Sequence, residues 1–77
     1  MDKLLEYLAR SLVDRPDEVS VESFEEDDGT IVLELQVADD DTGKVIGRGG
    51  RTVAALRTVI KATAVRDGQR VLVDVVD

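Results

Sequence analysis

The sequence predicts a single α+β domain, in which a three-stranded sheet is packed on one side by three helices. The chain has 77 residues, which is enough for one small domain. It is 43% hydrophobic and 35% charged with one proline, a composition typical of a globular chain. Apolar residues recur at helical spacing in two long segments and alternate in three others. The predicted order over residues 1–77 is α-β-β-α-α-β.

The first element is predicted as a helix over residues 2–13. Its leucines follow the helical spacing i, i+4, i+8 and form one stripe, with Ala9 beside it: Leu4, Leu5, Leu8 and Leu12. Pro16 follows Asp14 and Arg15, and the residue before a proline disfavours helix, so the helix ends there. We expect the leucine stripe to join the core and Tyr7 to cover the edge of the helix.

Two strands are predicted next, over residues 18–25 and 30–38. The first alternates loosely, with Val19 and Val21 on one face, and the second alternates cleanly along the sequence TIVLELQVA. Between them Asp28-Gly29 predicts a hairpin turn, because both central positions tolerate positive φ. The charged residues 25–28 are then a solvated hairpin tip.

The second half of the chain predicts two helices and a strand. Any of the residues Asp39–Asp41 is suited to cap a short helix that runs to about Ile46. A helix from about Arg51 to Val65 carries an apolar stripe, and its basic residues Arg57 and Lys61 lie on another face. The stripe consists of Val53, Leu56, Ile60 and Ala64. A last strand over residues 70–76 places alternate valines inward.

Charge is divided between the two halves of the chain. Residues 1–43 contain three basic and 14 acidic side chains, whereas residues 44–70 contain seven basic and one acidic side chain. The whole chain has a net charge of −7, which argues against nonspecific binding to nucleic acid. The basic segment instead predicts an anionic partner at one place.

The absence of cysteine and histidine excludes several kinds of site. Disulfides, thiolate zinc sites, cysteine nucleophiles and histidine acid–base chemistry are all ruled out. We therefore expect neither an enzyme nor a bound cofactor or metal ion. No apolar run approaches the roughly 20 residues of a membrane span, and the N-terminal segment lacks the apolar stretch of a signal peptide. The expected location is the cytoplasm.

The glycine-rich loop over residues 47–50 is the main candidate for binding. It precedes a predicted helix, whose N-terminal N–H groups attract phosphate. Glycine allows a ligand backbone to approach closely, and Arg48 and Arg51 supply positive charge. The dinucleotide motif G-x-G-x-x-G fails because position 52 is Thr52, and the spacing of a P-loop is also absent.

The segment VIGRGGRTV resembles the signature of KH domains, in which a G-x-x-G loop between two helices clamps about four nucleotides of a single strand. The element order resembles the type II variant, and the whole chain is similar to the small bacterial KhpA family. The resemblance implies that Gly47, Arg48, Gly49 and Gly50 form the clamp. It implies that Ile46 and Val53 line a base groove, and that Lys44 and Arg51 flank it as phosphate contacts.

The resemblance also implies partners and a biological setting. It implies a single-stranded RNA-binding protein, an RNA chaperone, that acts with a larger KhpB-like KH protein in cell-shape and cell-wall regulation. Self-association as a homodimer is implied in the same way. Because many acidic side chains lie outside the loop, we expect RNA binding by the isolated domain to be weak and sensitive to salt.

Two other interpretations stay open at this point. The chain could be a protein-interaction adaptor that keeps the KH fold without significant RNA binding, with its acidic half docking a basic partner. An enzyme is the least favoured interpretation, because no nucleophile has a histidine to activate it.

Overall fold

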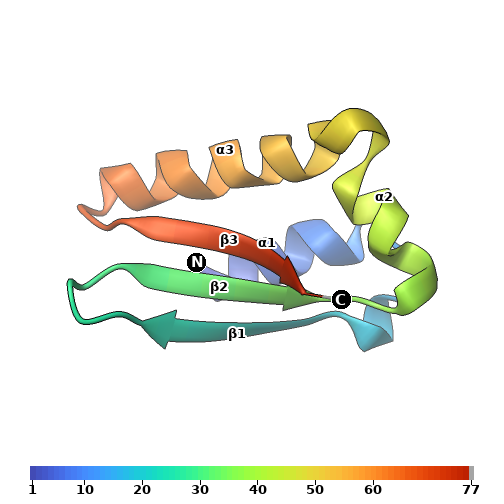
Figure 1. Ribbon diagram of the computed structural model, residues 1–77, viewed down its shortest axis with the longest axis horizontal. Coiled ribbons are helices and arrows are strands. Elements are labelled where there is room, and N and C mark those ends of the chain that lie inside the picture. Colours follow the sequence, from blue (N-terminus) through green and yellow to red (C-terminus); the bar gives the residue numbers. More distant parts are fainter. Residues whose placement is uncertain (77) are drawn as a thin grey trace.

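The computed structural model describes residues 1–76, and its order of elements confirms the predicted α+β class. The helices and strands are α1 (Asp2–Arg10), β1 (Ser20–Glu25), β2 (Ile31–Gln36), α2 (Thr42–Ile46), α3 (Arg51–Arg66) and β3 (Val71–Val76) (Figure 1). Three short 3-10 turns join them: η1 (Pro16–Glu18), η2 (Asp39–Asp41) and η3 (Arg48–Gly50).

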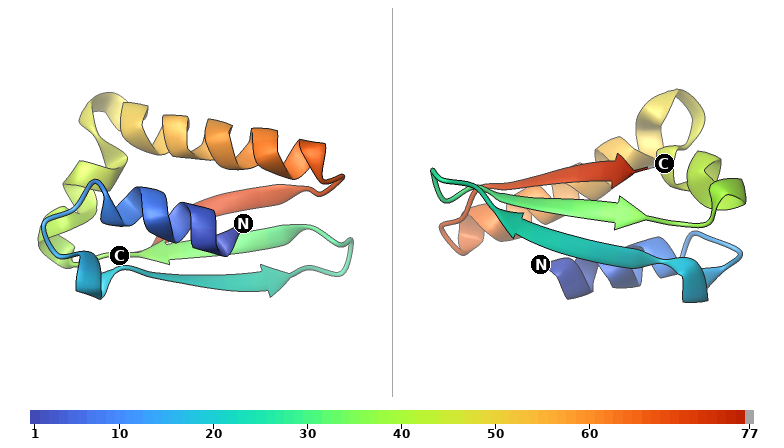
Figure 2. Two further views of the ribbon diagram at one scale, coloured as in Figure 1. Left: turned by 180° about the vertical axis from the view of Figure 1, so that it is seen from behind. Right: turned by 60° about the horizontal axis from the view of Figure 1, so that its bottom comes forward.

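The three strands form one mixed sheet with β2 in the centre. β1 runs antiparallel to β2, as a hairpin does, and β3 runs parallel to β2. A parallel neighbour requires a long crossover connection, which α2 and α3 supply. Figures 1 and 2 show that α1 and α3 lie on one side of the sheet, with α2 at one end, so the other face of the sheet is open.

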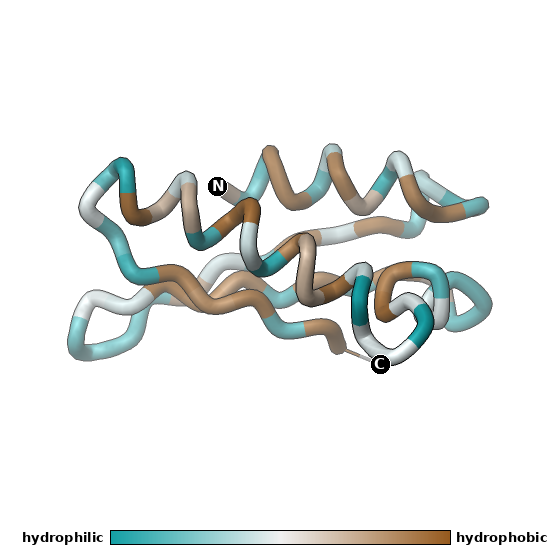
Figure 3. The backbone as a smooth tube through the Cα atoms, turned by 90° about the horizontal axis from the view of Figure 1, so that it is seen from above, coloured by the Kyte–Doolittle hydropathy of each residue, from teal (hydrophilic) through white to brown (hydrophobic). Residues whose placement is uncertain are grey.

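The core lies between the sheet and the two longer helices. All four residues of the predicted stripe of α3 are buried, as are Leu5 and Ala9 of α1. Leu33, Leu35 and Val73 face these helices from the sheet. Seen from above, hydrophobic and hydrophilic segments alternate along the helices, as amphipathic packing requires (Figure 3). The predicted inward faces of β2, α3 and β3 are therefore confirmed.

The prediction for the end of the first helix was wrong. α1 ends at Arg10 instead of residue 13, and β1 begins at Ser20 instead of residue 18, because the turn η1 extends to Glu18. The chain leaves the helix early because the N–H groups of Asp14 and Arg15 donate to the Asp41 carboxylate, at 3.2 and 3.0 Å. Leu12 consequently lies outside the helix and is exposed.

The predicted hairpin is confirmed, and only one of the two residues at its turn adopts a positive φ. Gly29 has φ of +88°, but no non-glycine residue among residues 1–76 has a positive φ, so Asp28 keeps an ordinary backbone conformation. The Gly29 N–H donates to the Glu26 carbonyl at 2.9 Å, and the Thr30 N–H donates to the Asp28 carboxylate at 2.9 Å. The side chain of Asp28 thus helps to close the turn without a second left-handed residue.

In the described part of the chain, no helix combines the length and the apolar character that crossing a membrane requires.

Candidate nucleic-acid interface

The segment 47–50 forms a tight turn between α2 and α3. The Gly47 N–H donates to the Gly43 carbonyl at 2.8 Å and ends α2, and the Gly50 N–H donates to the Gly47 carbonyl at 3.2 Å. Gly47, Gly49 and Gly50 all have positive φ values, of 77°, 65° and 76°. The turn therefore needs its glycines, because L side chains rarely adopt this backbone conformation.

Gly47 and Gly49 serve different purposes in the turn. Gly47 has φ of 77° and ψ of 172°, a region that is essentially restricted to glycine. A Cβ atom on Gly47 would lie 2.2 Å from the Thr52 hydroxyl oxygen, whereas a Cβ atom on Gly49 or Gly50 would meet nothing within 4 Å. Gly47 is thus closed against the first turn of α3, and Gly49 and Gly50 present open backbone to solvent.

Donors for an anionic ligand meet at this open backbone. Within residues 1–76, the N–H groups of Arg48 and Gly49 donate to no backbone carbonyl. α3 begins at Arg51 without a side-chain cap on its N-terminal N–H groups, and it is 16 residues long. Arg48 and Arg51 are exposed, and among the described residues neither guanidinium forms an ion pair. Unpaired N–H groups and free cations at a helix N-terminus form a site suited to phosphate.

Lys44 is already paired with two carboxylates. Its ammonium group donates to the Asp14 carboxylate and also lies 3.5 Å from the Asp41 carboxylate. The hydrogen bond to Asp14 raises the pKa of Lys44 above its usual range. Of the two basic residues predicted to flank the loop, Arg51 is therefore unpaired among the described residues and Lys44 is already bound.

Asp41 is the buried member of this cluster, with 1% of its surface exposed. Burial opposes its ionisation, but the N–H donors of Asp14 and Arg15, together with Lys44, outweigh burial and hold the pKa of Asp41 below its usual value. Asp41 precedes α2 but forms no cap hydrogen bond with it, so the expected capping role is wrong for this residue. Its carboxylate instead ties the segment after α1 to the start of α2.

The two predicted groove residues differ in exposure. Ile46 is partly exposed at the end of α2, whereas Val53 is buried with the apolar stripe of α3. The structure thus places Ile46 at the surface beside the glycine turn and gives Val53 mainly a packing role.

A second group of basic residues lies along the edge of the sheet, between α3 and β3. Two adjoining cavities there have volumes of about 310 and 250 Å³. Arg57 Nε donates to the Val73 carbonyl at 3.2 Å, which holds this guanidinium against the edge strand. We call this surface the α3–β3 groove, and its main lining residues are Arg57, Lys61, Val65, Arg70 and Leu72.

Arg57 and Lys61, which were predicted to share one face of the helix, both line this groove. The structure places Arg70 in the same cavity as Lys61. Val65 lies four residues after Lys61, so it extends the same face of α3. The position of Arg70 depends on how β3 docks, which that spacing does not reveal.

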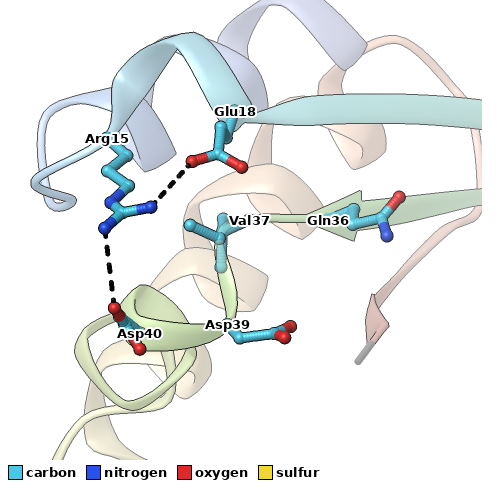
Figure 4. A pocket seen from close by; sticks show the side chains of 7 residues that line it. Arg15, Glu18, Gln36, Val37, Asp39 and Asp40 are labelled. Carbon is cyan, nitrogen blue, oxygen red and sulfur yellow. Dashed lines mark hydrogen bonds and ion pairs between the residues drawn. The ribbon is translucent and has the colours of Figure 1, made fainter.

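A larger cavity, of about 410 Å³, lies between η1, the end of β2 and η2 (Figure 4). Arg15 bridges it, with ion pairs to Glu18 at 3.4 Å and to Asp40 at 3.7 Å. Asp39 adds a further carboxylate to the lining. Because the only cation in this lining is already paired, the cavity is poorly suited to a nucleic acid.

Comparison with known proteins gives a consistent result. A family model described as the KH domain of KhpA and KhpB matches residues 2–75. The chain is 53% identical over 76 residues to RNA-binding protein KhpA of Clostridium acetobutylicum, covering 99% of this chain and all of that one. It is 49% identical over 78 residues to RNA-binding protein KhpA of Halalkalibacterium halodurans, with both chains fully covered.

Part of a solved structure has the same fold at low sequence identity. A crystal structure of an Era variant from Aquifex aeolicus, bound to GDP and aluminium fluoride, superposes with a TM-score of 0.63 at 16% identity. The match covers 96% of this chain and 28% of that one.

Proposed function

The chain belongs to the KhpA/KhpB family of KH domains, and we propose that it binds single-stranded RNA through the turn at residues 47–50. The relatives in this family are named RNA-binding proteins, not enzymes, so the enzyme interpretation is set aside. One observation carries the proposal. The open backbone of Gly49 and Gly50 lies beside unpaired N–H groups and two free guanidinium groups at the start of α3.

In the proposed complex, the strand's phosphates lie on the turn and its bases follow the α3–β3 groove. Leu72 and Val65 give the groove an aliphatic wall, and Arg57, Lys61 and Arg70 give it positive charge. Ile46 extends the apolar surface at the turn. Val53 supports that surface from below, and Lys44 contributes less than Arg48 or Arg51, because its charge is already neutralised by Asp14 and Asp41.

The experiment is a titration with a short single-stranded oligouridine at low salt. The double variant Arg48→Asp with Gly49→Asp should reduce affinity at least about tenfold, because it places two carboxylates where phosphate binds. It should still fold, since aspartate tolerates the left-handed conformation and the space around Gly49 is open.

A matched control separates this local effect from net charge. Lys3→Asp with Tyr7→Asp makes the same change in charge on exposed positions of α1. The proposal expects this control to bind RNA nearly as the parent does. Equal binding by the parent and the loop variant would overturn the proposal.

We also propose that the domain pairs with a KhpB-like protein or with a second copy of itself. Support comes from an apolar cavity of about 250 Å³ between α1 and α3, beside which Leu12 and Val59 are exposed. Val59→Glu should shift the protein to a monomer in sedimentation velocity while leaving the sheet intact. If wild type is already monomeric at high concentration, the homodimer is excluded, and only a different partner could use this surface.

RNA-chaperone activity, cytoplasmic location and a role in cell-shape and cell-wall regulation stay predictions from the family resemblance. The adaptor interpretation keeps one favourable observation, which is the same apolar cavity between α1 and α3. It would be preferred if partner binding persisted in the loop double variant while RNA binding by the parent was undetectable.

A further inference from the structure

The open face of the sheet carries an exposed apolar row that runs across all three strands. Phe24 of β1 is paired with Val32 of β2, and Val32 is paired with Leu72 of β3. Phe24 is 47% exposed and Leu72 is 53% exposed, and Val32 between them is partly buried. The open face of a sheet is ordinarily polar, so a continuous row with an aromatic and a leucine side chain is unusual for a surface that stays in water.

Next to the apolar row, two residues away on each strand, the same face carries three carboxylates in a row. Glu22 is paired with Glu34, and Glu34 is paired with Asp74. Neighbouring strands lie about 4.8 Å apart, and like charges directly opposite one another are destabilising. Within residues 1–76, none of the three carboxylates forms an ion pair with a basic side chain. The isolated domain therefore holds an uncompensated negative row beside an exposed apolar row.

The apolar row and the acidic row together indicate which kind of partner suits the open face. Nucleic acids and anionic membranes would be repelled by three adjacent carboxylates. A partner that covers both rows needs apolar side chains over Phe24 and Leu72 and basic side chains over the carboxylates. The surface lies on the opposite side of the sheet from α1, and Leu72 is its border with the α3–β3 groove (Figure 1).

We propose that the open face binds a basic amphipathic helix of a partner protein, lying across the three strands. Each row spans about 10 Å, which is close to two turns of helix, and the two rows are separated by about 7 Å along the strands. A helix lying over the apolar row can therefore place lysine or arginine side chains from one flank over the acidic row. Such a helix adds the second layer that the sheet lacks on this face.

The probe is a synthetic helical peptide of about 14 residues, made of leucine and lysine in an amphipathic order. Amide chemical shifts of the whole domain should change on the open-face residues of the strands as this peptide is added. Asp74→Lys should weaken peptide binding at least about tenfold, and Phe24→Ser should weaken it several-fold. Both positions are exposed on outer strands, which limits the risk that the variants fail to fold.

Controls distinguish this site from general attraction to an acidic protein. Asp39→Lys makes the same charge change at exposed η2 and should leave peptide affinity nearly unchanged. A peptide of the same composition with scrambled order should bind much more weakly. Equal losses in Asp39→Lys and Asp74→Lys, equal binding of the scrambled peptide, or shift changes centred elsewhere would each overturn the inference.

The inference goes beyond the proposed RNA binding. Either proposal can be refuted by experiment while the other one stands. Phe24→Ser should keep oligouridine affinity, because Phe24 lies on the strand farthest from the α3–β3 groove. Loss of peptide binding with retained RNA binding supports the open-face site. Retained peptide binding in both open-face variants contradicts it, whatever the RNA titration shows.

Discussion

The turn at residues 47–50 and the open face of the sheet carry charges of opposite sign. At the turn, cations and unpaired N–H groups surround backbone that nothing covers. On the open face, three carboxylates stand side by side without a cation among the described residues. A net charge of −7 describes neither region. The contrast shows that binding is decided by which charges the fold brings to one surface and by whether they are already paired.

The largest expected effect tests how the turn is built. Gly47→Ala should destabilise the protein by about 2–4 kcal/mol, because it forces a glycine-only conformation and a clash with Thr52. Gly49→Ala should cost only about 1 kcal/mol, since nothing lies within 4 Å of the added carbon. Urea unfolding of both variants measures the difference. Equal stabilities would show that Gly47 is not closed against α3.

The next effect contrasts a buried carboxylate, Asp41, with an exposed one, Asp40. Asp41→Ala removes the acceptor for two backbone N–H groups and a partner of Lys44. Its midpoint of thermal unfolding should fall by roughly 10 °C. Asp40→Ala, on the exposed neighbouring position, is the control and should change the midpoint by no more than a few degrees. Similar midpoints for both variants would contradict the structural role assigned to Asp41.

Lowering the pH should remove the contribution of Asp41 to the stability of the wild-type protein. The pKa of Asp41 is lowered from 3.8 by folding, so its contribution to stability is present above pH 3.8 and is lost as the pH falls through the folded value. Denaturant midpoints measured between about pH 5 and pH 2 should therefore fall less in Asp41→Ala than in wild type. If the midpoints of both proteins fell equally with pH, Asp41 would not contribute to the acid sensitivity of folding.

A smaller effect sharpens the assignment of the α3–β3 groove to RNA. Lys61→Gln should weaken oligouridine binding by roughly three- to tenfold and reduce the slope of log affinity against log salt by about one. Arg10→Gln, on α1, is a control of equal charge change on the other helix. If both substitutions change the slope equally, the groove has no special part in binding.

The smallest effect concerns the acidic row itself. Glu34→Gln removes the central charge of the row and should stabilise the isolated domain by roughly 0.2–1 kcal/mol, since like charges directly opposite destabilise a sheet. Gln36→Glu adds a charge two residues away on the same face and is expected to have the opposite sign. Denaturant unfolding at low salt gives both values. If Glu34→Gln destabilised the domain, the Glu34 carboxylate would have to make a favourable contact that outweighs repulsion from Glu22 and Asp74.

Much of the fold follows from periodicity in the sequence. The stripe from Val53 to Ala64 and the alternation from Ile31 to Val37 each fix one buried face, because a residue on the wrong face would expose apolar surface. The early end of α1 could not be predicted, since it depends on two hydrogen bonds between residues that lie 27 and 26 positions apart in the chain.

The site was less predictable than the fold. The glycine turn is encoded locally, so its position and its neighbouring arginines were found from the sequence. The paired state of Lys44 and the place of Arg70 depend on tertiary contacts. The two rows on the open face require the strand register, which adds Glu22 and Asp74 to either side of Glu34 only after the sheet is formed.

The most direct measurement is a map of amide chemical shifts in the whole domain as single-stranded oligouridine is added. We expect the largest changes at Arg48, Gly49 and Gly50, with further changes along α3 and the edge of β3. Glu22 and Glu34 should change little, because the polyanion is repelled from the open face. A map centred on the open face, or one that leaves the turn unchanged at saturation, would contradict the account.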